Sequence, residues 1–234
     1  MLAGALVTSN AAAVPVLQLY IQGATYDPVE QSWYYPGHDF TLWAIGNLTG
    51  PGGTGGLAIT NVRLAVVYDD PGTPVTITFT PTSGSYMGFS DPSVPAAPTW
   101  LGTETDGSTP WIVGNKYVPN HGEYGAGRTW QEFSLGDFTT PDSQLGNFVD
   151  SFPAPGGPLD AQINAYTVHV DGADAHFDLY AQYQTERGQI HHLVAPGSHD
   201  ATDGPDTRTV PLPATWALLG IGALALGAIR RKSR

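Results

Sequence analysis

The chain has 234 residues, of which 41% are hydrophobic, 11% aromatic and only 13% charged, and it contains 29 glycines and 20 prolines. It has no cysteine, which excludes disulfides, thiolate metal sites, iron–sulfur clusters and thiol nucleophiles. The formal net charge of −12 argues against nucleic-acid binding, because an acidic protein repels phosphate backbones.

Residues 1–13 have the features of a partial signal peptide. The apolar stretch from Met1 to Val7 precedes Ser9 to Ala13, small residues of the kind that signal peptidase reads. We expect cleavage after Ala13. The alternative is a first strand with a frayed start.

Residues 14–183 are predicted to form one all-β domain. Apolar and polar residues alternate in six stretches, and this period of two is typical of strands. The stretches are Leu17–Ile21, Phe40–Ile45, Asn61–Tyr68, Val75–Thr80, Ile163–Val170 and His176–Tyr183. Parallel sheets would need a helix after nearly every strand, so we expect an antiparallel β-sandwich with jelly-roll or immunoglobulin-like packing.

Two turn sequences are predicted to close β-hairpins. The first turn, Asp69–Thr73, joins the stretch Asn61–Tyr68 to Val75–Thr80. The second, Asp171–Asp174, joins Ile163–Val170 to His176–Tyr183. In the strand that follows the first turn, Val75, Ile77 and Phe79 are expected to face inward while the threonines face water.

The aromatic residues allow two interpretations. Trp33, Tyr34 and Tyr35 could form a platform on which sugar rings stack, which would favour a glycan-binding module. The alternative, which we favour, is that the aromatic side chains fill a cysteine-free core. The same two interpretations apply to Trp100, Trp111, Tyr117, Tyr124 and Trp130.

One short helix is predicted over residues 141–152. Thr140 can cap it, Pro141 suits its first position, and Pro153 ends it. Its apolar residues recur at the spacing of one helix face. They are Leu145, Phe148, Val149 and Phe152.

No catalytic residues are predicted, because the local signatures of hydrolases and nucleotide-binding loops are missing from the sequence. Ser198, His199 and Asp200 are adjacent, so their side chains point apart and cannot relay a proton. His191 and His192 are a poor chelating pair for the same reason and are interpreted as loop histidines.

Calcium is the one cofactor that the sequence raises. Asp171, Asp174 and Asp178, with Asp69 and Asp70, could supply oxygen ligands near turns, although the EF-hand spacing is not met. Aspartate is common in turns without any metal, which is the simpler interpretation.

The body resembles the proteins called choice-of-anchor N over roughly Val14 to Asp200. This resemblance implies a surface location and a β-rich fold, and it implies no reaction. The matching segments are Leu17–Ile21 with Ala24–Asp27, Phe40–Gly46, Trp130–Phe133, Gln162–Tyr166, His176–Tyr180 and Ser198–Asp200.

Residues 184–209 are predicted to be a flexible acidic spacer, and residues 210–234 a sorting and anchoring signal. The signal starts with Val210, Pro211, Leu212 and Pro213. A membrane-spanning helix is then expected over residues 214–229, with Trp216 at one interface. Its other large apolar residues are Leu218, Leu219, Ile221, Leu224, Leu226 and Ile229.

The chain ends in a cluster of four of its nine basic residues, whereas all 21 acidic residues lie between Asp27 and Asp206. By the positive-inside rule the basic cluster stays in the cytoplasm and the acidic body faces outward. A buried core helix is the alternative, but it would have to bury the cations. These are Arg230, Arg231, Lys232 and Arg234.

This C-terminal pattern resembles the PEP-CTERM sorting region, with Leu212 where that family has a glutamate between the prolines. The resemblance implies export, with signal peptidase, membrane lipid and an exosortase as partners. We therefore expect a non-enzymatic protein of the cell surface or matrix, held in the inner membrane until it is processed. A carbohydrate-binding or calcium-dependent adhesion module is the alternative, and a secreted hydrolase is a distant third.

Overall fold

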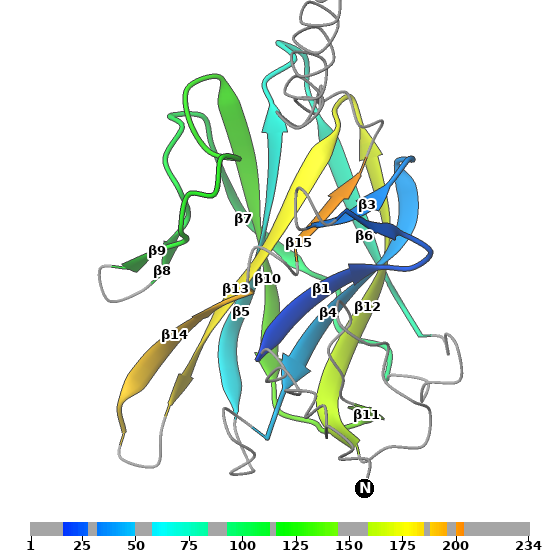
Figure 1. The fold of residues 1–234 in the computed structure, drawn as a ribbon, viewed down its shortest axis with the longest axis vertical. Helices are drawn as coiled ribbons and strands as arrows, with labels where there is room; N and C mark the ends of the chain where they lie inside the picture. The colour runs from blue at the N-terminus through cyan, green and yellow to red at the C-terminus, as the bar shows by residue number, and fades with distance from the viewer. Residues whose placement is uncertain are drawn as a thin grey trace, which may run out of the picture.

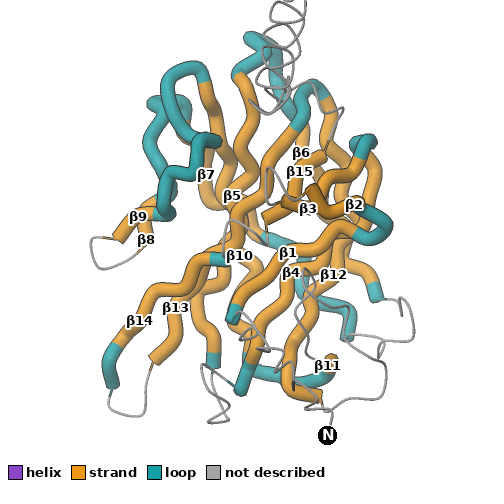
Figure 2. Tube along the Cα trace, viewed as in Figure 1, coloured by secondary structure: helices purple, strands orange, loops and turns teal. Residues whose placement is uncertain are grey.

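The computed structural model describes residues 16–27, 32–49, 58–83, 93–112, 116–144, 159–184, 188–195 and 200–203. These residues form strands, turns and loops, with no helix among them (Figure 2). Fifteen strands are assigned, and they belong to three sheets.

The first sheet has five strands, and all of its pairings are antiparallel. Its order is β1-β4-β12-β11, and β6 also pairs with β12. The strands are β1 (Leu17–Ile21), β4 (Asp39–Asn47), β6 (Thr76–Thr82), β11 (Ser143–Gln144) and β12 (Leu159–Asp171).

The second sheet has eight strands in the order β2-β3-β15-β13-β5-β10-β7, with β14 paired to β13. Its pairings are antiparallel except for the parallel pair of β15 and β3. The strands are β2 (Thr25–Asp27), β3 (Ser32–Tyr35), β5 (Ile59–Asp69), β7 (Thr99–Glu104), β10 (Arg128–Phe138), β13 (Ala175–Gln184), β14 (Ile190–Val194) and β15 (Asp200–Asp203).

The two large sheets share one core. Its buried side chains come from both sheets, for example Leu42 of β4 and Leu64 of β5. Aromatic rings meet edge to face across it: Phe40 of β4 lies 5.6 Å from Phe177 of β13, measured between ring centroids. Burial of apolar surface between sheets is therefore the main stabilising contribution to the fold.

A second, smaller core lies on the outer face of the eight-stranded sheet. Ala65, Val67, Trp130 and Tyr180 belong to it on the sheet side, and Ile112, Val118 and Tyr124 of residues 105–127 complete it. That covering segment includes the third sheet, a pair of short strands, β8 (Trp111–Ile112) and β9 (Lys116–Tyr117), at the side of the molecule (Figure 1). As a result, β5 and β13 are buried on both faces.

The predicted all-β fold with antiparallel sheets is confirmed for the described residues, and all six predicted strands are present as β1, β4, β5, β6, β12 and β13. The alternation predicted for Val75, Ile77 and Phe79 also holds, because all three pack against the core while Thr76 and Thr78 are exposed.

The two predicted hairpins are wrong. β5 belongs to the eight-stranded sheet and β6 to the five-stranded sheet, so the turn at Asp69–Thr73 crosses between sheets. The turn at Asp171–Asp174 does the same between β12 and β13. Turn residues reverse the chain in both cases, but each following strand buries its apolar face from the opposite side of the core.

Two further regions differ from the sequence prediction. Residues 143–144, in the predicted helix 141–152, form strand β11, where Asp142 N donates to the Ala161 carbonyl at 3.0 Å. Residues 145–152 lie outside the described residues. Within the predicted spacer 184–209, β14 and β15 extend the eight-stranded sheet.

Candidate functional site

The outer face of β13 carries a row of polar side chains. Residues in a strand alternate between faces, so Phe177 and Leu179 enter the main core while the residues between them point the other way. The outward row is His176, Asp178, Tyr180 and Gln182, and the covering segment lies over it.

Asp178 is the centre of the first candidate site. Its residue is only 1% exposed, and Tyr124 donates its hydroxyl to Oδ2 at 2.5 Å. His121 Nε2 lies 2.9 Å from Oδ1, and His176 Nε2 lies 3.4 Å from the same oxygen. The opposite nitrogen of His176, Nδ1, is 3.0 Å from Thr202 Oγ1.

The charges in this cluster support one another. Burial raises the pKa of Asp178, but the nearby His176 and His121 outweigh burial and hold that pKa well below its usual range. The hydrogen bond to Asp178 raises the pKa of His121 above its ordinary value. The carboxylate is therefore ionised at neutral pH and faces an imidazole that favours its protonated form.

The same three residues have the composition of a metal site. One ligand atom from each of His121, His176 and Asp178 can be chosen so that all three lie within 4.8 Å of one another. Imidazole nitrogen and carboxylate oxygen are common ligands of zinc and related divalent ions.

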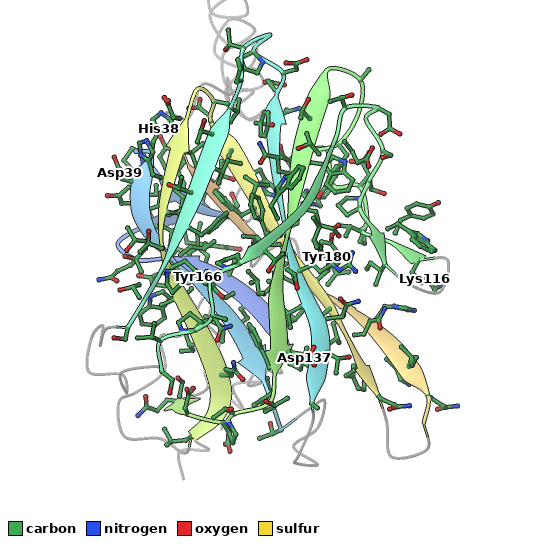
Figure 3. All side chains as sticks on the ribbon, turned by 180° about the vertical axis from the view of Figure 1, so that it is seen from behind. His38, Asp39, Lys116, Asp137, Tyr166 and Tyr180 are labelled. Atoms are coloured by element: carbon green, nitrogen blue, oxygen red, sulfur yellow. The ribbon has the colours of Figure 1, made fainter. Side chains whose placement is uncertain are left out.

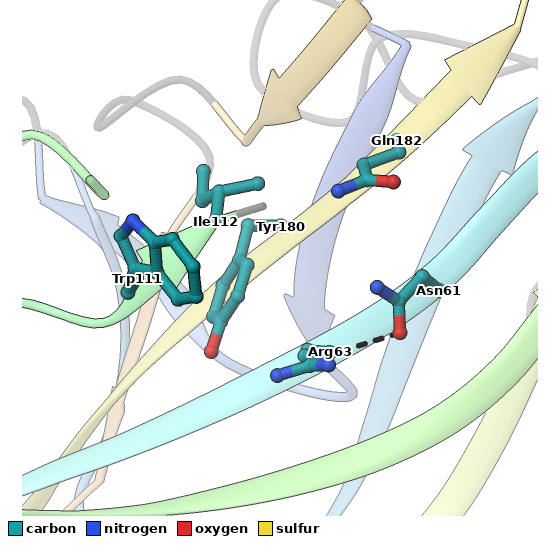
Figure 4. A pocket seen from close by; sticks show the side chains of 6 residues that line it. All are labelled: Asn61, Arg63, Trp111, Ile112, Tyr180 and Gln182. Atoms are coloured by element: carbon teal, nitrogen blue, oxygen red, sulfur yellow. Dashed lines mark hydrogen bonds between the residues drawn. The ribbon is translucent and has the colours of Figure 1, made fainter. Parts of the chain in front are cut away.

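The second candidate site is a small hollow on the same sheet face (Figure 4). Its walls come from β5, β8 and β13. It is lined by Asn61, Arg63, Trp111, Ile112, Tyr180 and Gln182.

A charged network forms one wall of the hollow. Arg63 Nη1 donates to Glu132 Oε1 at 2.9 Å, and the Tyr180 hydroxyl donates to the same oxygen. Arg63 Nε also donates to Asn61 Oδ1 at 3.2 Å (Figure 4). Burial, with a contribution from Glu132, raises the pKa of Tyr180 well above its ordinary value, so this hydroxyl stays a donor.

Backbone irregularity positions these side chains. Asn61 has a positive φ of 56°, and its N–H donates to Asp137 Oδ1 at 2.7 Å. Near Asn61, the pairing of β5 shifts register against both neighbouring strands. The shift against β13 lies between Tyr180 and Gln182, and the shift against β10 lies between Ser134 and Gly136. Such bulges re-aim side chains and are frequent next to binding sites. Figure 3 shows Tyr180 on this face of the molecule, with Asp137 farther along it.

Two aromatic side chains are exposed beside the hollow. Trp111 is 52% exposed and Tyr117 is 61% exposed, and the two are directly paired across β8 and β9. The Nε2 of Gln182, a residue only 9% exposed, has no hydrogen-bond partner in the structure. The hollow therefore combines an accessible ring with a buried amide nitrogen that has no hydrogen-bond partner in the structure.

The other predicted aromatics are distributed differently. Trp33 is 6% exposed and packs edge to face with Tyr20 and Tyr26, so it is a core residue rather than an open platform. Tyr34 and Tyr35 next to it are half-buried. Trp130 and Tyr124 are buried in the smaller core, and Trp100 is 59% exposed on β7.

The three aspartates proposed for calcium are not one group. Asp178 belongs to the cluster with the two histidines, which includes neither Asp171 nor Asp174. Asp174 instead lies 3.8 Å from His38 Nε2 at an exposed position. His191, predicted in a loop, lies on β14 and stacks on Tyr183 at 4.9 Å between ring centroids.

His121, Arg63 and Glu132 were missed as site residues. The period of two over residues 176–182 already indicates that four polar side chains share one face, which is the signal that sequence analysis could have used. The partners come from segments at least 40 residues away along the chain, as in Glu132–Tyr180 with a separation of 48. Nothing local in the sequence connects such residues.

The predicted signal peptide, sorting motif, anchor and basic tail lie outside the described residues. In the part of the chain that the structure describes, no helix has the length and apolarity needed to cross a membrane.

Comparison with known proteins bears on the C-terminal segment. Residues 209–232 match the family model described as the PEP-CTERM protein-sorting motif. This motif indicates a protein that is exported, recognised by an exosortase and sorted to the cell surface. No curated protein matches the chain. The resemblance to choice-of-anchor N proteins stays a prediction.

Proposed function

We propose that this is a non-catalytic protein of the cell surface or extracellular matrix, a β-sandwich that exosortase processing releases or transfers. The observation that carries the proposal is the sorting motif at residues 209–232. Residues 214–229 would hold the protein in the inner membrane before processing, with the basic end in the cytoplasm.

The size of the hollow is in keeping with a surface protein that does not enclose a substrate. Its free volume of about 10 Å³ has room for about one water molecule, so the hollow does not enclose a small-molecule ligand.

Cell fractionation with intact-mass analysis of the native protein tests this proposal. We expect a species that lacks residues 1–13 and occurs in the envelope or the medium, and that keeps its C-terminal segment when the exosortase is deleted. Replacing both Pro211 and Pro213 by alanine should have the same effect as deleting the exosortase. A full-length species in the cytosol would overturn the proposal.

A second candidate function, binding of neutral glycans, is favoured by one observation. Trp111 is 52% exposed and lies at the hollow with the amide of Gln182. An aromatic face that stacks on a sugar ring, with nearby amide and guanidinium donors for hydroxyl groups, is suited to carbohydrates.

Isothermal titration with soluble neutral polysaccharides tests this second function. Trp111→Ala should reduce affinity by about fivefold or more, since a stacked aromatic contributes about 1 kcal/mol. Trp100→Ala is the matched control, because Trp100 is similarly exposed, 59% against 52% for Trp111, but does not line the hollow. Equal binding by both variants would reject the hollow as the glycan site.

A further inference from the structure

We propose that His121, His176 and Asp178 form a binding site for a divalent transition-metal ion of the zinc class. Two of the ligands are fixed by one strand. His176 and Asp178 are two residues apart on β13, so both side chains project from the same face. The third, His121, approaches from the covering segment.

The distances suit a small ion. In a tetrahedral zinc site with metal–ligand bonds of about 2.0–2.1 Å, neighbouring ligand atoms lie about 3.4 Å apart. His176 Nε2 and Asp178 Oδ1 are 3.4 Å apart, and His121 Nε2 is 2.9 Å from the same oxygen. All three ligand atoms lie within 4.8 Å of one another, so a small adjustment of the His121 ring, the most exposed of the three, would bring them around one ion.

The contacts behind these ligands have the pattern of a supported metal site. His176 Nδ1 is engaged by Thr202 Oγ1 at 3.0 Å, which leaves Nε2 facing Asp178. Tyr124 holds Oδ2 of Asp178 at 2.5 Å, which leaves Oδ1 facing the histidines. Metal-binding histidines and carboxylates are usually oriented by such outer hydrogen bonds.

A metal-free cluster is the alternative: His121 pairs with Asp178, while His176 accepts from Thr202 at Nδ1 and donates Nε2–H to the same carboxylate. In the other tautomer His176 donates Nδ1–H to Thr202, and its Nε2 lone pair faces the carboxylate lone pairs at 3.4 Å. A cation bound among the three ligand atoms takes up both sets of lone pairs, and metal titration distinguishes the two arrangements.

The ligand set also indicates which metals fit. Calcium and magnesium prefer all-oxygen sites, whereas two imidazoles and one carboxylate suit zinc, cobalt, nickel or copper. His121 has 27% of its side chain exposed, against 7% for His176 and 2% for Asp178. Solvent therefore reaches the site from the His121 side, where a fourth ligand such as water can bind.

The test uses the full chain, purified in detergent and stripped of metal with EDTA. Titration with Co²⁺ should give one equivalent of bound ion with the visible absorption bands of tetrahedral coordination, and Zn²⁺ should displace it. Zn²⁺ at 100 times its Kd should raise the midpoint of thermal unfolding, as expected for a ligand that binds only the folded state.

His121→Ala is the most informative variant, because its ring is the most exposed of the three ligands. It should weaken Co²⁺ binding by at least about tenfold and abolish the tetrahedral spectrum. His169→Ala is the matched control, since His169 forms a comparable pair with Asp39 at 2.7 Å outside the cluster. Circular dichroism of each variant verifies folding.

Two results would overturn the proposal. One is the absence of Co²⁺ and Zn²⁺ binding by the wild-type chain at 100-fold molar excess. The other is unchanged binding and an unchanged spectrum in a folded His121→Ala variant.

Discussion

Asp178 illustrates how this sheet accommodates a buried charge. A carboxylate that loses its water must regain hydrogen bonds or opposite charge from the protein. Asp178 obtains both, from the hydroxyl of Tyr124 on one oxygen and from His121 and His176 around the other. The covering segment is thus held to the sheet by polar contacts as well as by the small apolar core beneath it.

Tyr124→Phe should destabilise the protein by about 1–3 kcal/mol, because it removes a donor from a buried carboxylate and leaves the packing intact. The free energy of unfolding from urea titration measures the effect. Tyr117→Phe should change it by less than about 0.5 kcal/mol, since Tyr117 is 61% exposed. Equal values for the two variants would show that the Tyr124 hydroxyl contributes nothing to stability.

Tyr166 provides a pH-dependent prediction. Burial raises its pKa to about 12, against a weaker opposing effect of the Asn164 hydrogen bond. The unfolded chain therefore loses this proton first, and the stability that neutral Tyr166 provides is fully present below pH 10 and lost as the pH rises toward 12.

Between these limits the free energy of unfolding should fall by roughly 1.4 kcal/mol per pH unit more in the wild type than in Tyr166→Phe. Urea unfolding of both proteins from pH 8 to pH 12 measures the difference. Curves that stay parallel across this range would contradict the prediction.

At the scale of strands, the two turns that cross between the sheets, Asp69–Thr73 and Asp171–Asp174, constrain each other by close contact. Gly172 has a φ of +98°, and a Cβ at this position would lie 3.1 Å from the Pro74 carbonyl oxygen. The turn between β12 and β13 is therefore in close contact with the segment that leads into β6. Only glycine combines a positive φ with such a close approach of a neighbouring backbone atom without strain.

Gly172→Ala should cost about 1–3 kcal/mol of stability, because it adds backbone strain and a close contact. Gly102→Ala is the control: Gly102 lies in β7, and an added Cβ would meet no atom within 4 Å. Thermal unfolding distinguishes the two. A Gly172→Ala protein as stable as the control would show that the two turns do not constrain each other.

The strands after residue 184 should be essential to the body. β15 lies between β3 and β13 in the sheet order, so it connects β2 and β3 to the rest of the sheet. Ala195, next to β14, is buried and donates its N–H to the Leu179 carbonyl at 2.8 Å. A body that ended at residue 184 would lose all of these contacts.

We expect a chain ending at residue 209 to unfold with a single cooperative transition. A chain ending at residue 184 should melt at least about 10 °C lower or fail to fold, since losing a few kcal/mol lowers Tm by about 2–4 °C per kcal/mol in a domain of this size. Circular dichroism during heating measures both. Identical transitions would support the prediction, made from composition, that residues 184–209 are a flexible spacer.

The strands were predictable because alternation is a local property. The residues Val62, Leu64 and Val66 face the main core, as their spacing indicates. The pairing of strands was not predictable in the same way. Asp69–Thr73 and Asp171–Asp174 have the composition of hairpin turns, but which sheet the next strand joins depends on distant partners such as β12 for β6.

In the candidate sites, too, the local arrangement of residues on one strand was predictable and the long-range contacts were not. The shared face of His176, Asp178, Tyr180 and Gln182 can be inferred from their spacing alone. His121 and Trp111 come from a loop-rich segment whose path across the sheet depends on burial of Val118 and Ile112. Long-range packing of this kind has no local signature in a single sequence.

At the scale of the whole molecule, charge and apolarity are divided between two parts of the chain. All 21 acidic residues lie between Asp27 and Asp206, and four of the nine basic residues lie in the last five positions. The segment between them, residues 214–229, has no charged residue. Such a division suits a protein whose two ends are on opposite sides of a membrane during export.

Replacing the four terminal basic residues by serine should therefore change the topology of the precursor. Moving four cations across a bilayer costs on the order of 10 kcal/mol, so we expect them to retain the C-terminus in the cytoplasm. The residues are Arg230, Arg231, Lys232 and Arg234.

The measurement is protease protection of a C-terminal tag in spheroplasts of a host without an exosortase. The tag should be protected in the wild type and digested in the serine variant. A variant with lysine at all four positions keeps the charge and should behave as the wild type, which separates charge from side-chain identity. A tag protected equally in all three proteins would mean that the positive charges do not hold the end of the chain in the cytoplasm, and the anchoring role proposed for residues 214–229 would then need another basis.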